Sequence, residues 1–239
     1  MLLQLNTVSV MAQTLSSLSD DEILQASGMP QDMINSLDND IKKCIVNDLK
    51  NNANLSDLQY IGAVSSLSPS TSKDVGLFAN QVFYDITFSV TAFKSGSVIY
   101  IYPTYEFTAD HQPKGNDSFA FQLGDAFVPY EYGGRLWYKD YTMSDWELGG
   151  SLVANNQGFN GAEFSGAQLG SPDWRMKFKG YTYCHAQVGT GSDKRIIMTY
   201  MHNPNRASYS ISFSYKGVGI TYNSSGTIYT NAQTDFISY

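Results

Sequence analysis

The stretch YDITFSVTA, residues 84–92, decides the fold class of this chain. Its apolar side chains occupy every second position and alternate with aspartate, threonine and serine. Successive side chains of a β-strand point to opposite faces, so this period of two predicts a strand with one buried face and one solvent-exposed face. Such a strand belongs to a sheet that covers a hydrophobic core.

Comparable segments recur at short spacing along the rest of the chain. Residues 98–108 are apolar on both faces, which predicts a central strand, although Pro103 predicts a bulge or an edge position within it. Further candidate strands are residues 119–123, 136–139, 174–179, 181–188, 195–202, 208–215, 218–222 and 227–229. Because no helical period separates them, the fold class is mainly β, an antiparallel β-sandwich or barrel with a small N-terminal helical segment.

That helical segment covers residues 17–60 and predicts three short helices. Ser19-Asp20-Asp21-Glu22 forms a capping box, Pro30 suits the first turn of a second helix, and Asp38 can cap a third. Three short helices cannot bury a sufficient core alone. We therefore expect them to dock on the β domain.

The other boundaries follow from composition. Residues 61–81 are rich in serine and glycine and predict a linker, and residues 82–239 form the predicted sandwich domain. Residues 1–16 fit the remnant of a signal peptide, because Val10-Met11-Ala12 before Gln13 has the residue preference of a secretory cleavage site. An ordinary chain terminus is the alternative.

Two runs resemble uncharacterised secreted proteins of Gram-positive bacteria. They are SDDEILQASGMPQDMINSLDNDIKKCIVNDLK at the N-terminal end and TYMHNPNRASYSISFSYKGVGITYNSSG near the C-terminal end. The resemblance implies an extracellular, bacterial cell-surface setting and no particular chemistry. Cys44 lies in an expected helix and Cys184 in an expected strand, which favours two separate buried thiols, although the sequence leaves their pairing open.

Composition and motifs exclude several classes of function. A net charge of −7 is unsuited to nucleic acid, and no run approaches the 18 or so apolar residues of a transmembrane helix. None of the three histidines has metal-ligand spacing, and no nucleophile motif such as G-x-S-x-G occurs. We therefore expect no metal and no cofactor.

The most informative segment is FVPYEYGGRLWYKDYTMSDWE, residues 127–147. Aromatic rings with neighbouring acids and amides suit a sugar surface or a protein partner. The alternative is a β-core with tyrosine hydroxyls at its edge, because tyrosine is a good strand former. The hypothesis is a secreted, non-enzymatic protein that binds a surface, a glycan, a cell wall or a partner protein, with the glycine-rich residues 149–172 as a functional loop. The predicted binding residues are Tyr130, Tyr132, Trp137, Tyr138, Asp140, Tyr141, Trp146 and Glu147.

Two alternatives stay open. Serine and threonine alternate with apolar residues at 84–92 and 208–215, which also fits a membrane-active, pore-forming β protein that contacts a membrane surface. Paired carboxylates could instead cleave glycans. The candidates for that chemistry are Glu131, Asp140, Asp145, Glu147 and Glu163.

A short cationic stripe, Arg175, Lys177 and Lys179, occupies alternate positions of one expected strand. We interpret it as a solvated strand face, and contact with an anionic wall polymer or lipid headgroups is the alternative.

Overall fold

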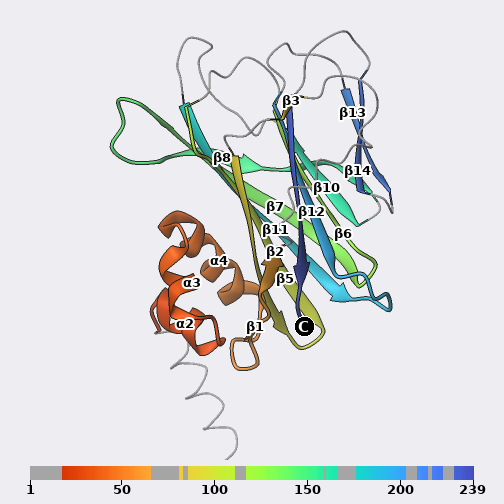
Figure 1. The fold of residues 1–239 in the computed structure, drawn as a ribbon. Helices are drawn as coiled ribbons and strands as arrows, with labels where there is room; N and C mark the ends of the chain where they lie inside the picture. Colours follow the sequence, from red (N-terminus) through yellow and green to blue (C-terminus); the bar gives the residue numbers. More distant parts are fainter. Residues whose placement is uncertain are drawn as a thin grey trace, which may run out of the picture.

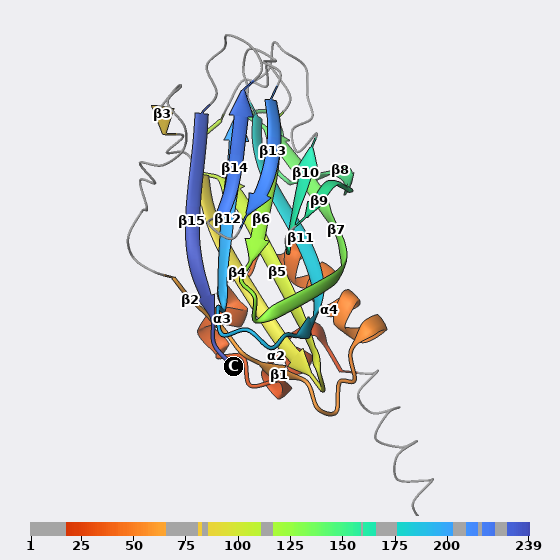
Figure 2. The ribbon, with the colours of Figure 1, turned by 90° about the vertical axis from the view of Figure 1, so that its right-hand side faces the viewer.

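Two β-sheets packed face to face form the body of the molecule, and three helices cover the outer face of one of them (Figures 1 and 2). The computed structural model describes residues 18–65, 81–82, 86–110, 117–158, 160–165, 176–202, 209–214, 217–222 and 229–239. The mainly antiparallel sandwich with an N-terminal helical segment is confirmed.

The sheet beneath the helices, sheet A, has six strands. Their order is β1 (Gln59–Tyr60), β4 (Ile86–Ser95), β5 (Val98–Phe107), β11 (Met176–Val188), β7 (Phe127–Asp140) and β8 (Glu147–Leu152). The opposing sheet, sheet B, has the order β2 (Ala63–Ser65), β15 (Tyr229–Ile237), β12 (Arg195–His202), β6 (Ser118–Leu123), β10 (Gly161–Ser165) and β9 (Ala154–Gly158), with β3 (Gln81–Val82) parallel to β15.

A separate two-stranded ribbon, β13 (Tyr209–Ser214) with β14 (Gly217–Tyr222), lies over the outer face of sheet B (Figure 2). Ile211 is buried, whereas Ser210 and Ser212 are exposed, as the alternation predicts. Phe213 lies directly against Gly161 of β10. Over residues 210–213, β13 therefore turns its apolar side chains to sheet B and its serines to solvent.

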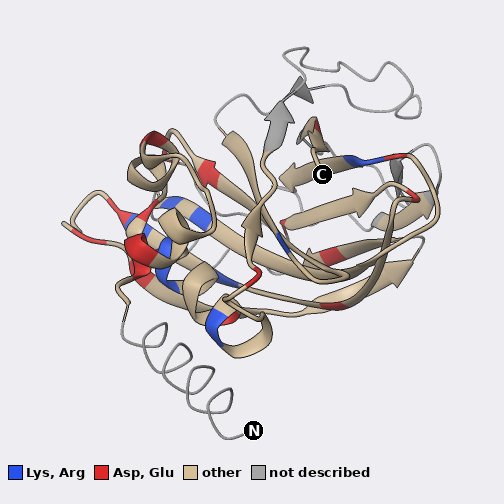
Figure 3. Ribbon diagram, turned by 90° about the horizontal axis from the view of Figure 1, so that it is seen from below, with Lys and Arg blue, Asp and Glu red and all other residues tan. Residues whose placement is uncertain are grey.

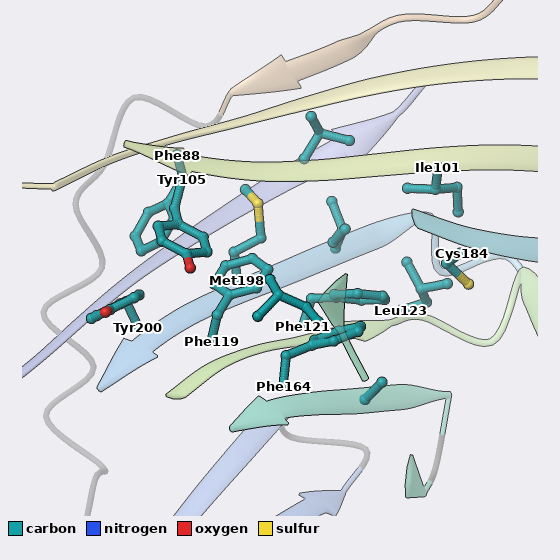
Figure 4. Close-up of a cluster of buried hydrophobic side chains, with 14 of the residues drawn as sticks. Phe88, Ile101, Tyr105, Phe119, Phe121, Leu123, Phe164, Cys184, Met198 and Tyr200 are labelled. Atoms are coloured by element: carbon teal, nitrogen blue, oxygen red, sulfur yellow. The ribbon is translucent and has the colours of Figure 1, made fainter. Parts of the chain in front are cut away.

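Aromatic side chains from both sheets fill the core of the sandwich (Figure 4). Tyr105 of β5 stands between Phe119 and Tyr200 of the opposite sheet, with ring centroids 4.9 and 5.0 Å apart. Phe121 stacks on Phe164 at 5.9 Å. Each such ring contributes about 1.5–3 kcal/mol on burial, so this layer supplies the main driving force for closing the sandwich.

The expectation that 98–108 forms a central strand is confirmed, but the expected bulge or edge at Pro103 is wrong. β5 lies between β4 and β11, and its register with β4 runs through the Pro103–Val90 pair without a shift. Proline has no N–H for the ladder. On the β11 side the pairing is interrupted there, and the hydroxyl of Thr182 donates to the Pro103 carbonyl at 2.9 Å instead.

The predicted functional loop at 149–172 is also largely wrong. Its described residues form β8, β9 and β10, and the chain passes from the edge of sheet A to the edge of sheet B at Val153. Glycine and asparagine are poor strand formers, which hid these strands, of which β8 and β9 lie at sheet edges. Residues 166–172 lie outside the described residues, as do residues 1–16 and 66–80 of the expected signal remnant and linker.

Helices α2 (Asp20–Ala26), α3 (Gln31–Ser36) and α4 (Asn39–Asn52) form what we call the helical cap. Ser19 and Glu22 make the predicted capping box, and Asp38 caps α4 by accepting from the amides of Asp40 and Ile41. Pro30 precedes α3 as its N-cap. The cap buries Ile34, Ile45, Leu49 and their neighbours against Phe93, Tyr100, Tyr102, Trp137 and Tyr181 of sheet A.

The two cysteines are unpaired. Cys184 lies in the core of the sandwich, whereas Cys44 is half-buried on α4. Burial raises the pKa of the Cys44 thiol, which makes it a weak nucleophile.

We predict that Gly180→Ala destabilises the fold by about 1–3 kcal/mol, the usual cost of overpacking. Gly180 lies opposite Tyr105, and a Cβ there would overlap a ring that is itself fully buried. Urea denaturation measures the loss. Gly158→Ala is the control, because its Cβ would meet Phe213 at an ordinary 3.8 Å, and an equal loss there would contradict the explanation.

Candidate functional site

The aromatic stretch 127–147 does not form one surface, because most of it lies along the single long strand β7. Tyr130 and Tyr138 are eight residues apart on that strand, which corresponds to roughly 25 Å at about 3.3 Å per residue. The structure therefore separates Tyr130 and Tyr132 from the other six predicted residues. The two ends of β7 are therefore separate candidate sites.

At the β7–β8 end, the two tryptophans hold a lysine rather than facing solvent. Lys179 of β11 is fully buried, and its Nζ lies 4.7 Å from the Trp146 ring centroid and 5.5 Å from that of Trp137. The same Nζ donates to Asp38 Oδ1 at 2.7 Å and to Asp40 Oδ2 at 2.8 Å. We call these five residues the Lys179 cage.

The Lys179 cage joins the cap to sheet A. Its carboxylates come from the first turn of α4, and its cation and rings come from β11, β7 and the β7–β8 connection. Charged residues of both signs gather where the helices meet the sheet (Figure 3). A buried ammonium needs such partners because burial without them is very costly.

This arrangement corrects the solvated-stripe interpretation for Lys179. Lys177 is half-buried, and Arg175 lies outside the described residues. Trp137, at 6% exposure, packs in the interface between cap and sheet, and Trp146 is half-buried beside it.

The remaining residues of this end form a hairpin network. The Tyr138 hydroxyl donates to Glu147 Oε2 at 2.8 Å, and this hydrogen bond raises the pKa of Tyr138. Asp140 accepts from the amide and hydroxyl of Thr142 at 2.7 and 2.6 Å, and the hydroxyl contact is the main cause of its lowered pKa. Tyr141 is 74% exposed at the tip.

The other end of β7 has a β-bulge that places two consecutive side chains on one face. Glu131 pairs with His185 and Pro129 with Ala186, so Tyr130 has no partner on β11. Such a bulge re-aims side chains. The Tyr130 ring lies 6.2 Å from the His185 ring, and Glu131 Oε2 lies 3.0 Å from His185 Nδ1. Tyr132 turns inward and packs against Phe121 at 6.0 Å.

His185 is the buried centre of this end, at 1% exposure. Its second nitrogen, Nε2, lies 2.8 Å from Asp48 Oδ2 of α4, and Asp48 also accepts from the Tyr102 hydroxyl at 2.7 Å. Burial alone would lower the pKa of His185, but the hydrogen bonds and charges of Asp48 and Glu131 outweigh it, so the pKa is raised above 6.5.

Beside His185, part of sheet A is left open by the cap. α4 ends at Asn52, whose carbonyl accepts from Tyr100 at 2.6 Å. One step farther along the strands, Val128 pairs with the exposed Gln187. Val128 and Tyr130 are 53% and 54% exposed, and the Glu131 side chain is 49% exposed. We call Val128, Tyr130, Glu131 and Gln187 the bulge surface.

Sequence reasoning missed His185, Asp48 and Lys179. Cys184 and His185 lie on opposite faces of β11, the thiol in the core of the sandwich and the imidazole toward the cap. The one available signal was the acidic face of α4, whose Asp40 and Asp48 fall two turns apart and reach the sheet.

The carboxylates that the sequence offers for glycan cleavage make other contacts in the structure. Glu131 binds His185, Asp140 closes a turn, and Glu163 accepts from Ser118 and Ser165 in sheet B at 2.9 and 2.8 Å. Within the described ranges, no group of three or more His, Cys, Asp and Glu side chains could hold a metal ion.

A membrane-spanning helix, both long and apolar enough, is absent from the described part of the chain.

No family model matches the chain, and the curated proteins gave no significant match. Among solved structures, the chain is similar to ACE19, the collagen binding subdomain of the Enterococcus faecalis surface protein ACE, at 7% identity and TM-score 0.33, covering 66% of this chain and 99% of that one. It is also similar to a pore forming protein at 10% identity and TM-score 0.30, covering 62% and 84% of the two chains.

A third similar structure is AvmM, which catalyzes macrocyclization in alchivemycin A biosynthesis, at 11% identity and TM-score 0.22, covering 64% of this chain and 89% of that one. Likenesses at this level carry no argument about function. The mainly β fold is compatible with a binding protein, and the proposals below depend on the chain's own residues.

We predict that Lys179→Met destabilises the protein by about 1–2 kcal/mol, because the partly exposed Asp38 and Asp40 lose the ammonium that donates to both. Urea denaturation followed by tryptophan fluorescence measures this loss. Lys177→Met, on the same strand, is the control and should change stability by less than about 0.5 kcal/mol. If Lys179→Met and Lys177→Met lowered the free energy of unfolding by equally small amounts, the Lys179 cage would contribute little to stability.

Proposed function

We propose that this chain is an extracellular, non-enzymatic binding protein that contacts its ligand through the bulge surface. The observation that carries the proposal is the β-bulge, which presents the Tyr130 ring and the Glu131 carboxylate side by side and half-exposed. Bulges are enriched where a sheet re-aims a side chain for function. Val128 of β7 and its partner Gln187 of β11 lie next to these two residues and enlarge the surface.

The chemistry of the bulge surface suits a neutral glycan. An aromatic ring packs against the C–H face of a sugar, while the Glu131 carboxylate accepts and the Gln187 amide both donates and accepts hydrogen bonds. The supporting positions are firm, because Glu131 is held by His185 and the ring of Tyr183 covers Gly133 on the neighbouring strand. A preorganised surface loses less entropy on binding.

We predict that Tyr130→Ala lowers affinity at least tenfold, since a central aromatic contact typically contributes 1–2 kcal/mol or more. Co-sedimentation with isolated bacterial walls and insoluble glycans provides the measurement. Phe236→Ala is the matched control, because Phe236 is an exposed aromatic residue, 44% accessible, on sheet B.

Tyr141→Ala separates the two ends of β7. If Tyr141→Ala abolishes binding and Tyr130→Ala does not, the ligand contacts the β7–β8 hairpin and the bulge surface is the wrong site. Trp137→Ala is unsuitable as a binding test, because Trp137 is buried against the cap.

A second candidate function, contact with a lipid surface, is favoured by the β13–β14 ribbon. On β13, the buried Ile211 and the half-buried Phe213 share one face, which lies against sheet B. The exposed Ser210 and Ser212 of β13 share the other face. Each strand has six residues, fewer than the 9–11 or so that span a bilayer, so the ribbon suits the membrane surface.

A removable cross-link tests this second function. In the double variant Gly161→Cys, Phe213→Cys, a disulfide would hold the ribbon on sheet B. We predict that oxidation abolishes co-sedimentation with anionic vesicles and that reduction restores it. Vesicle binding that is unaffected by oxidation, or absent from the wild type, would contradict lipid contact through the ribbon.

A further inference from the structure

Both nitrogens of His185 face carboxylate oxygens. Nε2 lies 2.8 Å from Asp48 Oδ2, and Nδ1 lies 3.0 Å from Glu131 Oε2. The two carboxylates come from different parts of the molecule, Asp48 from the cap and Glu131 from the bulge of β7. The imidazole is therefore the link between α4 and the bulge surface.

The charge of the ring follows from counting donors. An ionised carboxylate only accepts, and a neutral imidazole has one N–H and one lone pair. A neutral ring would direct that lone pair at one of the two carboxylates, which is repulsive. An imidazolium donates to both, and its positive charge offsets one of the two negative charges beside it.

We propose that His185 is a proton-dependent latch, which holds the cap and Glu131 together while the ring is charged and releases one of them when the ring loses its proton. The released group is Glu131. Its side chain is 49% exposed and can be solvated, whereas that of Asp48 is 12% exposed and is also held by the Tyr102 hydroxyl.

The surroundings of His185 support one titration in the neutral range. The groups that face it are Asp48 from α4, Glu131 and Tyr130 from β7, Tyr100 from β5 and Tyr183 from β11. Tyr102 of β5 donates to Asp48. Burial is the largest cause of the raised pKa of Tyr100, Tyr102, Tyr130 and Tyr183. These phenols therefore stay neutral across this range.

The direction of the pH effect follows from linkage. The native pKa of His185 is raised above 6.5, so its contribution to stability is fully present below pH 6.5 and is lost as the pH rises through the native pKa. Acid therefore strengthens the attachment of the cap through a charge-assisted His185–Asp48 hydrogen bond. Mild alkali weakens the attachment, because the neutral ring that has released Glu131 keeps only an ordinary hydrogen bond to Asp48. A consequence for ligand contact rests on the proposed function: Glu131 is fixed beside Tyr130 only while the latch is closed.

Nitrogen NMR of the His185 ring tests the charge state without any ligand. We predict that both ring nitrogens carry protons at pH 6.5, that the titration midpoint lies above pH 6.5, and that Glu131→Gln and Asp48→Asn each lower it. A neutral tautomer at pH 6.5, or a midpoint that neither variant changes, would overturn the proposal.

Hydrogen–deuterium exchange of the α4 amides tests the consequence for the cap, after correction for the intrinsic pH dependence of exchange. We expect less protection at pH 8.5 than at pH 6 in the wild type and an equal, lower protection at both pH values in His185→Gln. Lys179→Met serves as the control, because it should loosen the cap at both pH values and leave the pH dependence intact. A wild-type pH dependence that persists in His185→Gln would refute the latch.

Since neither experiment uses a ligand, their failure leaves the binding proposal standing, and failure of the wall and glycan assays leaves the latch standing.

Discussion

The outer face of sheet A has to be covered, and the rest of the structure depends on that constraint. Strands β5 and β11 have apolar side chains on both faces, and sheet B covers only the inner one. On the outer face, Tyr100, Tyr102 and Tyr181 would otherwise expose large rings to water. The helical cap has too small a core to fold alone, so cap and sheet each supply the apolar surface that the other lacks.

Apolar contact alone would leave the position of the cap on the sheet weakly specified, since rings and aliphatic chains pack in many arrangements. The polar contacts remove that freedom. Lys179 meets the first turn of α4 and His185 meets its third, so a shift of the helix by one turn would leave a buried cation or imidazole without its carboxylate. Polar groups buried in an interface cost free energy unless satisfied, and this penalty selects one arrangement.

Much of the fold was predictable because it depends on local patterns. The alternation at 84–92 and 208–215, the two apolar faces of 98–108 and the caps at Ser19 and Asp38 all carry their information in neighbouring residues. The errors share a different cause. A period of two shows that Lys177 and Lys179 share a face, but it cannot show that a helix rather than water covers Lys179. In the same way, composition suggested a loop at 149–172, where edge strands tolerate glycine and asparagine because only one side is paired.

The candidate site was predictable in its strand, and Tyr130 and Glu131 were both named as candidates, but their arrangement side by side was not predictable. The aromatic stretch does contain Tyr130, yet regular alternation would place Tyr130 and Glu131 on opposite faces, and only the bulge opposite His185 brings both outward. That bulge also explains why one carboxylate can serve two parts of the molecule. Glu131 lies at the boundary between the covered and open areas of sheet A. One of its oxygens therefore accepts a hydrogen bond from the buried imidazolium, while the rest of the side chain faces solvent. A group in that position responds both to the proton on His185 and to anything that binds beside Tyr130, and thermodynamic linkage requires each to affect the other.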